Sequence, residues 1–173
     1  NALGVGIWYD LGRFYAGEGN MREAEAGFRQ ALDISQNRFG TNHPLNGPSQ
    51  EALAGILITK HQYDEASRLL SASKEHALQQ WGEDTAKLAD IALKQAAVAL
   101  QRDNAQDAVA YANEAQKIYV AKRLIAPLIE ATCLLAQAQT AQELKSPAAS
   151  KSIDQCLLLS VQNKSTQNIP NQS

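Results

Sequence analysis

The stretch WYDLGRFYAGEGNMREAEAGFRQA, residues 8–31, decides the fold. Its apolar residues recur at spacings of three and four on both sides of a short break, as they do on one face of an α-helix. The break is Gly17-Glu18-Gly19-Asn20, and glycines beside an asparagine favour a turn over a continuous helix. The stretch therefore predicts two antiparallel helices that fold back on each other as a hairpin.

The same pattern returns along the chain at a fixed interval. Ala24, Ala66 and Ala108 each end a short polar triplet, and they are spaced by 42 residues. A second series of very small residues has the same spacing, and helix axes approach closely only where such residues meet. A constant period predicts stacked copies of one hairpin, which share a core that no single copy could bury. The second series is Gly12, Ala54, Ala96 and Ala138.

The period predicts an all-α solenoid of about four antiparallel helix-turn-helix repeats. The fourth copy is the weakest, because Ser150 stands where an alanine is expected. We expect the repeats at about residues 5–46, 47–88, 89–130 and 131–162, followed by a flexible polar tail over 163–173. The expected helices span 5–17, 21–38, 49–60, 63–80, 86–102, 105–121, 128–144 and 148–161.

Composition and charge favour packed helices and give no basis for binding to nucleic acid or a membrane. Hydrophobic residues make up 45% of the chain and aromatic residues only 6%. The formal net charge of −2 comes from 16 basic and 18 acidic residues that are spread along the chain, without a basic stripe. The longest apolar stretches fall far short of the ~18 residues that a membrane-spanning helix needs. Neither nucleic acid nor a membrane is therefore expected as a partner.

No residue pattern in the sequence indicates catalysis, a metal site or a cofactor. His43 is expected in a turn, His61 at a helix end and His76 on a second helix, and no pair of them has metal-ligand spacing. No glycine-rich phosphate-binding motif is present. The acidic residues near helix starts are expected there for structural reasons. The chain is therefore not expected to be an enzyme, and no cofactor is predicted.

The two cysteines and the start of the sequence give information about the cellular compartment of the chain. Cys133 and Cys156 are interpreted as two small buried core residues, with a disulfide between them as the alternative. A disulfide would favour an oxidising compartment. The chain begins at Asn1 without a signal peptide, so a processed end or a piece of a longer chain is expected. The sequence does not determine the compartment, although a cytoplasmic location is preferred to a periplasmic one.

The first hairpin resembles the tetratricopeptide repeat, whose signature is Trp, then Leu-Gly, then Tyr on the first helix and Ala, Phe, Ala on the second. The second copy keeps Leu53, Ala54, Ala66 and Leu70. The usual period of this family is about 34 residues. The longer repeats found here, and the Gly-x-x-His-Pro element within residues 39–44, resemble the kinesin light chain type. The first copy carries the full signature in Trp8, Leu11, Gly12, Tyr15, Ala24, Phe28 and Ala31.

The resemblance implies a right-handed solenoid whose first helices line a concave groove for an extended or helical peptide. A clamp for an acidic chaperone tail is not expected, because Asp90 would repel a carboxylate. The alternative is that these positions are simply solvated. The resemblance places in the groove Tyr9, Arg13, Glu51, Ile58, Thr59, Leu93, Lys94, Gln101 and Gln139.

The expected function is that of a protein–protein interaction scaffold or adaptor that binds a peptide or a partner protein through the groove. The alternative is a structural or self-association module, or a regulatory segment of a larger protein, that docks through an open end of the repeats. The groove cations Arg13 and Lys94 predict acidic groups on the partner segment.

Overall fold

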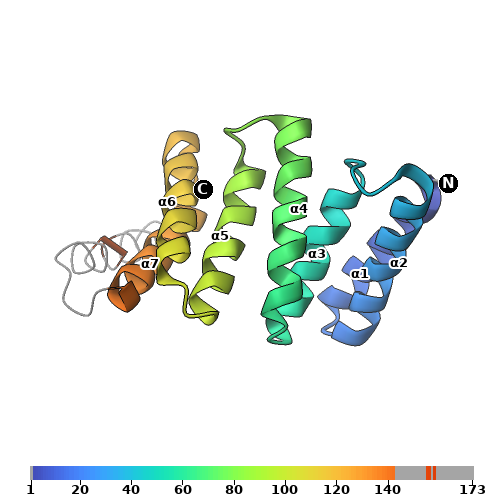
Figure 1. Cartoon of the computed structure of the whole chain (residues 1–173), viewed down its shortest axis with the longest axis horizontal. Helices are drawn as coiled ribbons and strands as arrows, with labels where there is room; N and C mark the ends of the chain where they lie inside the picture. Colours follow the sequence, from blue (N-terminus) through green and yellow to red (C-terminus); the bar gives the residue numbers. More distant parts are fainter. Residues whose placement is uncertain (1, 143–154, 157, 159–173) are drawn as a thin grey trace, which may run out of the picture. The chain divides into compact units, whose positions relative to one another are not determined.

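The computed structural model describes residues 2–142, 155–156 and 158, and within these residues the secondary structure is helical, without a strand (Figure 1). Consecutive helices are joined by short turns and loops. The helices of residues 2–142 are α1 (Ala2–Gly17), α2 (Met21–Phe39), α3 (Asn46–Thr59), α4 (Tyr63–Trp81), α5 (Ala86–Gln101), α6 (Ala105–Lys122) and α7 (Ile125–Gln142).

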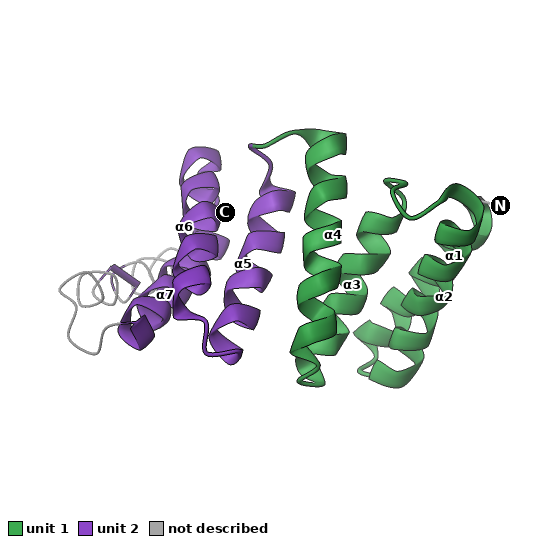
Figure 2. Cartoon of the chain, viewed as in Figure 1, with its two compact units in different colours: residues 1–83 green, residues 84–173 purple. Residues whose placement is uncertain are grey.

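The chain divides into two compact units, Asn1–Glu83 and Asp84–Ser173 (Figure 2). In the first unit, α1 packs against α2, α3 packs against α4, and α2 also packs against α3. In the second unit, α5 packs against α6, α6 packs against α7, and α5 contacts α7. In the first unit, then, two successive hairpins lie beside each other, and in the second unit α7 lies beside the α5–α6 hairpin.

The predicted helices agree with the observed ones, with three early starts. Helix α1 begins at Ala2, three residues before its predicted start. Helix α3 begins at Asn46 and α7 at Ile125, each three residues before its predicted start. Pro48 and Pro127 lie in the first turns of these helices, where a proline costs little because the first N–H groups have no helical partner. The predicted helix over 148–161 falls largely outside the described residues, and the predicted tail over 163–173 lies wholly outside them.

The small residues that set the 42-residue period form the centre of both units. Each of the six alanines in the two series is 0% exposed, so no larger side chain would fit without displacing a neighbour. The alanines of the second helices are Ala24, Ala66 and Ala108, and those of the first helices are Ala54, Ala96 and Ala138.

The α1–α2 hairpin has a very close crossing. A Cβ atom at Gly12 would lie 2.7 Å from the Phe28 ring and 3.2 Å from the carbonyl oxygen of Ala24. A Cβ atom at Gly27 would lie 2.9 Å from the Cα of Gly12. The expected approach of Gly12 to Ala24 is therefore confirmed, and Gly27 is a second contact glycine that the repeat pattern did not reveal.

The turns inside the hairpins repeat the same backbone conformation. Gly19, His61 and Asp103 have φ angles of 76°, 58° and 56°, and they are spaced by 42 residues. Glycine adopts this left-handed conformation without strain, whereas histidine and aspartate do not. His61 therefore occupies a constrained turn position, where its Nδ1 lies 2.6 Å from the Tyr63 hydroxyl oxygen.

The cysteine interpretation is wrong. Cys133, on α7, forms a disulfide with Cys156, and the two Cα atoms are 5.0 Å apart. The sequence separation of 23 residues alone does not show whether two helical cysteines face each other, because helix rotation decides the direction of each Cβ. The chain has no free cysteine.

Candidate protein-binding surface

The first helices of successive hairpins share an accessible face, which is clearest on α5. On α5, nine of 16 residues are buried, and they include apolar, alanine and amide side chains. Four of the remaining residues are separated by four, three and four positions, so they share one face of the helix. These residues, exposed or half-buried, are Asp90, Lys94, Ala97 and Gln101.

The same positions are accessible on α1 and α3, at offsets of 84 and 42 residues. On both helices the four residues are exposed or half-buried. Most of the other residues of α3 are buried. We call these positions on α1, α3 and α5 the first-helix stripe. Its members on α1 are Gly6, Asp10, Arg13 and Gly17, and those on α3 are Pro48, Ala52, Gly55 and Thr59.

In the first unit the stripe consists mainly of small residues. A Cβ atom added at Gly6, Gly17 or Gly55 would meet no atom within 4 Å, so open space adjoins these backbone positions. Asp10 and Arg13 supply the two charges of this part of the stripe. A ligand segment could therefore approach the helix backbone closely here.

In the second unit the stripe is polar. Asp90 accepts a hydrogen bond from the Tyr119 hydroxyl at 2.6 Å, and Tyr119 is buried on α6. This carboxylate thus helps to hold α5 against α6. Lys94 is half-buried and Gln101 is exposed, and Gln139 is the half-buried equivalent of Ala97 on α7.

The predicted groove residues fall into three groups by exposure. Arg13, Thr59 and Gln101 are exposed. Glu51 and Leu93, with exposures of 6% and 8%, lie in the core, so neither is an accessible contact. The two occupy equivalent repeat positions one step away from the stripe, and the sequence alone did not determine the rotation of these helices. The half-buried members of the predicted set are Tyr9, Ile58, Lys94 and Gln139.

An ion-pair network joins α2 to the end of α3 and the first turn of α4. The Arg29 guanidinium donates to Glu25 Oε1 and to Glu65 Oε1, both at 2.8 Å. Lys60, at the C-terminal end of α3, lies with its Nζ 2.6 Å from Glu25 Oε2. The network ties the first hairpin to the second. No local pattern indicates it, because bonded partners lie up to 36 residues apart.

The network shifts the ionisation of its carboxyls. The hydrogen bond from Lys60 lowers the pKa of Glu25 below its ordinary value, and that from Arg29 lowers the pKa of Glu65. The hydrogen bond to Glu65 in turn raises the pKa of Arg29. These shifts favour the charged forms of Glu25, Glu65 and Arg29.

Buried polar side chains also connect α3 to α4. His76 Nδ1 lies 2.9 Å from the Gln50 side-chain oxygen, and the Ser73 hydroxyl donates to the Gly47 carbonyl at 3.0 Å. His76, expected on a second helix, is buried there and is therefore a packing residue. Such a bond inside a hairpin favours one helix register over its alternatives.

Metal ligands and membrane-spanning helices are both absent from the part of the chain that the structure describes. No group of three or more histidines, cysteines, aspartates and glutamates there could hold a metal ion. No described helix combines the length and the apolarity that crossing a membrane requires.

Comparison with known proteins identifies the repeat. Residues 5–75 match the family model described as tetratricopeptide repeat. No curated protein has significant sequence similarity to the chain.

Solved structures share the fold at low sequence identity. BtubC (BKLC) from P. vanneervenii matches with a TM-score of 0.82 at 18% identity, over 98% of this chain and 68% of that one. A Podosopora anserina kinesin light chain with nearly identical TPR-like repeats matches with a TM-score of 0.72 at 19% identity, over 92% of this chain and 76% of that one. The apo form of RapI matches with a TM-score of 0.82 at 13% identity, over 95% of this chain and 58% of that one.

At these identities the structures show the fold alone, which is an all-α repeat fold of the solenoid class. The signature in the first hairpin, the matched family model and the shared fold agree. Residues 5–75 therefore match the tetratricopeptide repeat family, and the chain shares the fold of the kinesin light chain-like repeat structures.

Proposed function

We propose that the chain binds a peptide or a partner protein through the first-helix stripe. The tetratricopeptide fold commonly serves as a protein-interaction scaffold and is generally not enzymatic. The observation that supports the stripe is its recurrence: the same four positions stay accessible on α1, α3 and α5. Within the first unit, where α1 and α3 both present these positions, a surface that recurs in successive repeats is suited to an extended ligand.

The chemistry of the stripe indicates the kind of ligand. The open space beside Gly6, Gly17 and Gly55 admits bulky ligand side chains in the first unit. In the second unit, Gln101 offers an amide, which can pair with a peptide backbone without a charge preference. Arg13 and Lys94 each favour an acidic ligand group. The ligand should therefore be a segment with bulky side chains and acidic residues.

Site-directed crosslinking tests where ligands bind. Peptides would first be selected from a displayed random library against the full chain. A photo-crosslinking amino acid would then be placed at Gly55, with Gln79, an exposed residue of α4, as the matched control. The proposal expects the selected peptides to crosslink at position 55 and not at position 79. Equal crosslinking at both positions, or crosslinking at 79 alone, would contradict it.

Charge reversal tests the expected ligand chemistry. Arg13→Glu combined with Lys94→Glu should weaken binding of acidic selected peptides by about tenfold or more, or roughly 1.4 kcal/mol. The difference should shrink at high salt, because exposed charges are screened. Unchanged affinity in the double variant would mean that these two cations do not contact the ligand.

A further inference from the structure

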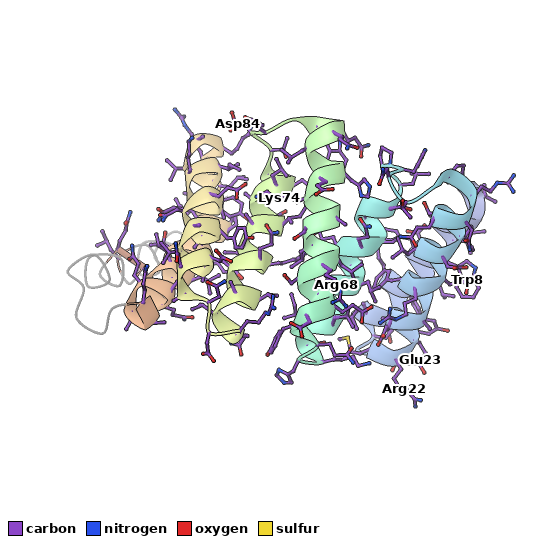
Figure 3. All side chains as sticks on the ribbon, in the orientation of Figure 1. Trp8, Arg22, Glu23, Arg68, Lys74 and Asp84 are labelled. Atoms are coloured by element: carbon purple, nitrogen blue, oxygen red, sulfur yellow. A yellow bond between two sulfur atoms is a disulfide. The ribbon has the colours of Figure 1, made fainter. Side chains whose placement is uncertain are left out.

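Helix α1 exposes an apolar face that belongs neither to its hairpin contact nor to the stripe. Leu3, Ile7 and Phe14 are 70%, 58% and 61% exposed. Their spacings of four and seven residues bring them onto one side of the helix. In Figure 3, Trp8 of the same helix also projects outward at the edge of the first unit. We call Leu3, Ile7 and Phe14 the α1 face.

The repeat shows what covers this face in the next hairpin. The equivalents of Ile7 and Phe14 on α3 are Ser49 and Ile56, which are 1% and 6% exposed. Helix α3 has two helical neighbours, α4 of its own hairpin and α2 of the preceding one. Helix α1 packs against α2 and has no comparable contact with another described helix. The α1 face is thus in the position where a second helix of another hairpin would lie.

The charges next to the α1 face indicate what such a helix would carry. Where α2 meets α3 and α4, Glu25 pairs with Lys60 and Arg29 pairs with Glu65. The residues of the first hairpin that correspond to Lys60 and Glu65 are Glu18 and Glu23. Both are exposed, and neither has an ion-pair partner among the described residues.

Arg22 lies beside Glu23 at the start of α2 (Figure 3), so the corner formed by Glu18, Arg22 and Glu23 keeps a net charge of −1. A helix that docks on α1 as α2 docks on α3 would place two side chains, one helical turn apart, opposite these two carboxylates. Charge complementarity then requires both side chains to be basic.

We propose that the α1 face binds an amphipathic helix with an apolar stripe and two basic residues one turn apart on its flank. A second copy of this chain does not supply such a helix from its described residues. At the two positions, α2 has Glu25 and Arg29, so Glu25 would meet Glu18 with like charge. The corresponding pairs are Ser67 and Ser71 on α4, and Val109 and Asn113 on α6.

An added hairpin provides the probe. A copy of residues 1–42 would be joined directly ahead of residue 1 of the full chain, which preserves the 42-residue period. In one fusion the added hairpin is native, and in the second it carries Glu25→Arg, so that both of its flank residues are basic. Hydrogen exchange of the original α1 amides would be measured in both fusions and in the unfused chain.

We expect exchange of the α1 amides to slow by about tenfold in the Glu25→Arg fusion relative to the unfused chain. In the native fusion the slowing should be about threefold smaller, because one exposed ion pair is missing. Glu18→Lys in the original hairpin should reverse the order of the two fusions. Phe14→Lys should remove the protection, while Ile7→Ser should retain most of it, because serine occupies the buried equivalent on α3.

Two results would overturn the proposal. One is an exchange rate of the α1 amides that is the same with and without the added hairpin, or that does not change with the charges at residues 18 and 25. The other is a dimer of the unfused chain in sedimentation experiments that Phe14→Lys dissociates, because the occupant would then be a second copy.

Discussion

The α1–α2 and α3–α4 hairpins occupy equivalent positions of the repeat, yet they differ in the residues at their crossings and in the burial of their first helices. The first crosses on Gly12 and Gly27, and Phe14 on its outer side is 61% exposed. The second has Leu69 at the position of Gly27, and Ile56 at the position of Phe14 is 6% exposed. The burial of a repeat position is therefore decided by the adjacent hairpin as much as by its own residue.

The largest expected effect concerns the second unit, where a covalent bond adds to helix packing. Reducing the Cys133–Cys156 disulfide should lower the free energy of unfolding of this unit by about 3 kcal/mol, because the closed loop restricts the unfolded chain. Urea unfolding with and without reductant, followed by circular dichroism, measures the loss. Thiol titration of denatured, unreduced protein should find no free thiol, and two free thiols would contradict the bridge.

The glycine crossing of the first hairpin should be nearly as sensitive. Gly27→Leu introduces the leucine that the second hairpin has at Leu69, but here its Cβ would lie 2.9 Å from Gly12. We expect this overpacking to lower the free energy of unfolding of the first unit by about 2–3 kcal/mol. Tryptophan fluorescence reports it selectively, since Trp8 and Trp81 both belong to the first unit. Gly55→Leu, which faces open space, is the control, and equal small losses would show that the crossing is not tight.

The ion-pair network should contribute less to the free energy of unfolding than the disulfide or the glycine crossing does. The Arg29 side chain is 43% exposed, so solvent screens its charge. The lowered pKa values of Glu25 and Glu65 mean that the contribution is present above the ordinary carboxyl pKa of 4.5 and is lost as the pH falls below it. Arg29→Met should cost about 1 kcal/mol at pH 7 and little at pH 3, as measured by urea unfolding at the two pH values.

The control for this prediction is Arg22→Met, since Arg22 has no ion-pair partner among the described residues. Its unfolding free energy should stay within about 0.5 kcal/mol of the native value at both pH values. A loss for Arg29→Met that does not depend on pH would mean that the arginine stem, rather than its charge, stabilises the first unit.

The positions of the helices could be predicted from the sequence, because the alanine series at 42-residue spacing marks the hairpin crossings within residues 2–142. The sequence was not sufficient for contacts that depend on helix rotation. Glu51 and Leu93 lie in the core although Thr59 and Gln101, eight residues further on, are exposed. The disulfide and the Arg29–Glu65 pair were missed for the same reason, since each requires two side chains from different parts of the chain to face each other.

If the first-helix stripe binds the ligand, two substitutions at Gly55 should change the affinity for a selected peptide to different extents. Gly55→Tyr fills the open space beside α3, whereas Gly55→Ala leaves most of it and should not weaken the helix. We expect Gly55→Tyr to raise the Kd of the peptide by about tenfold or more and Gly55→Ala to leave it within about twofold. A Kd that is the same for Gly55→Tyr as for the native chain, with the fold intact by circular dichroism, would contradict it.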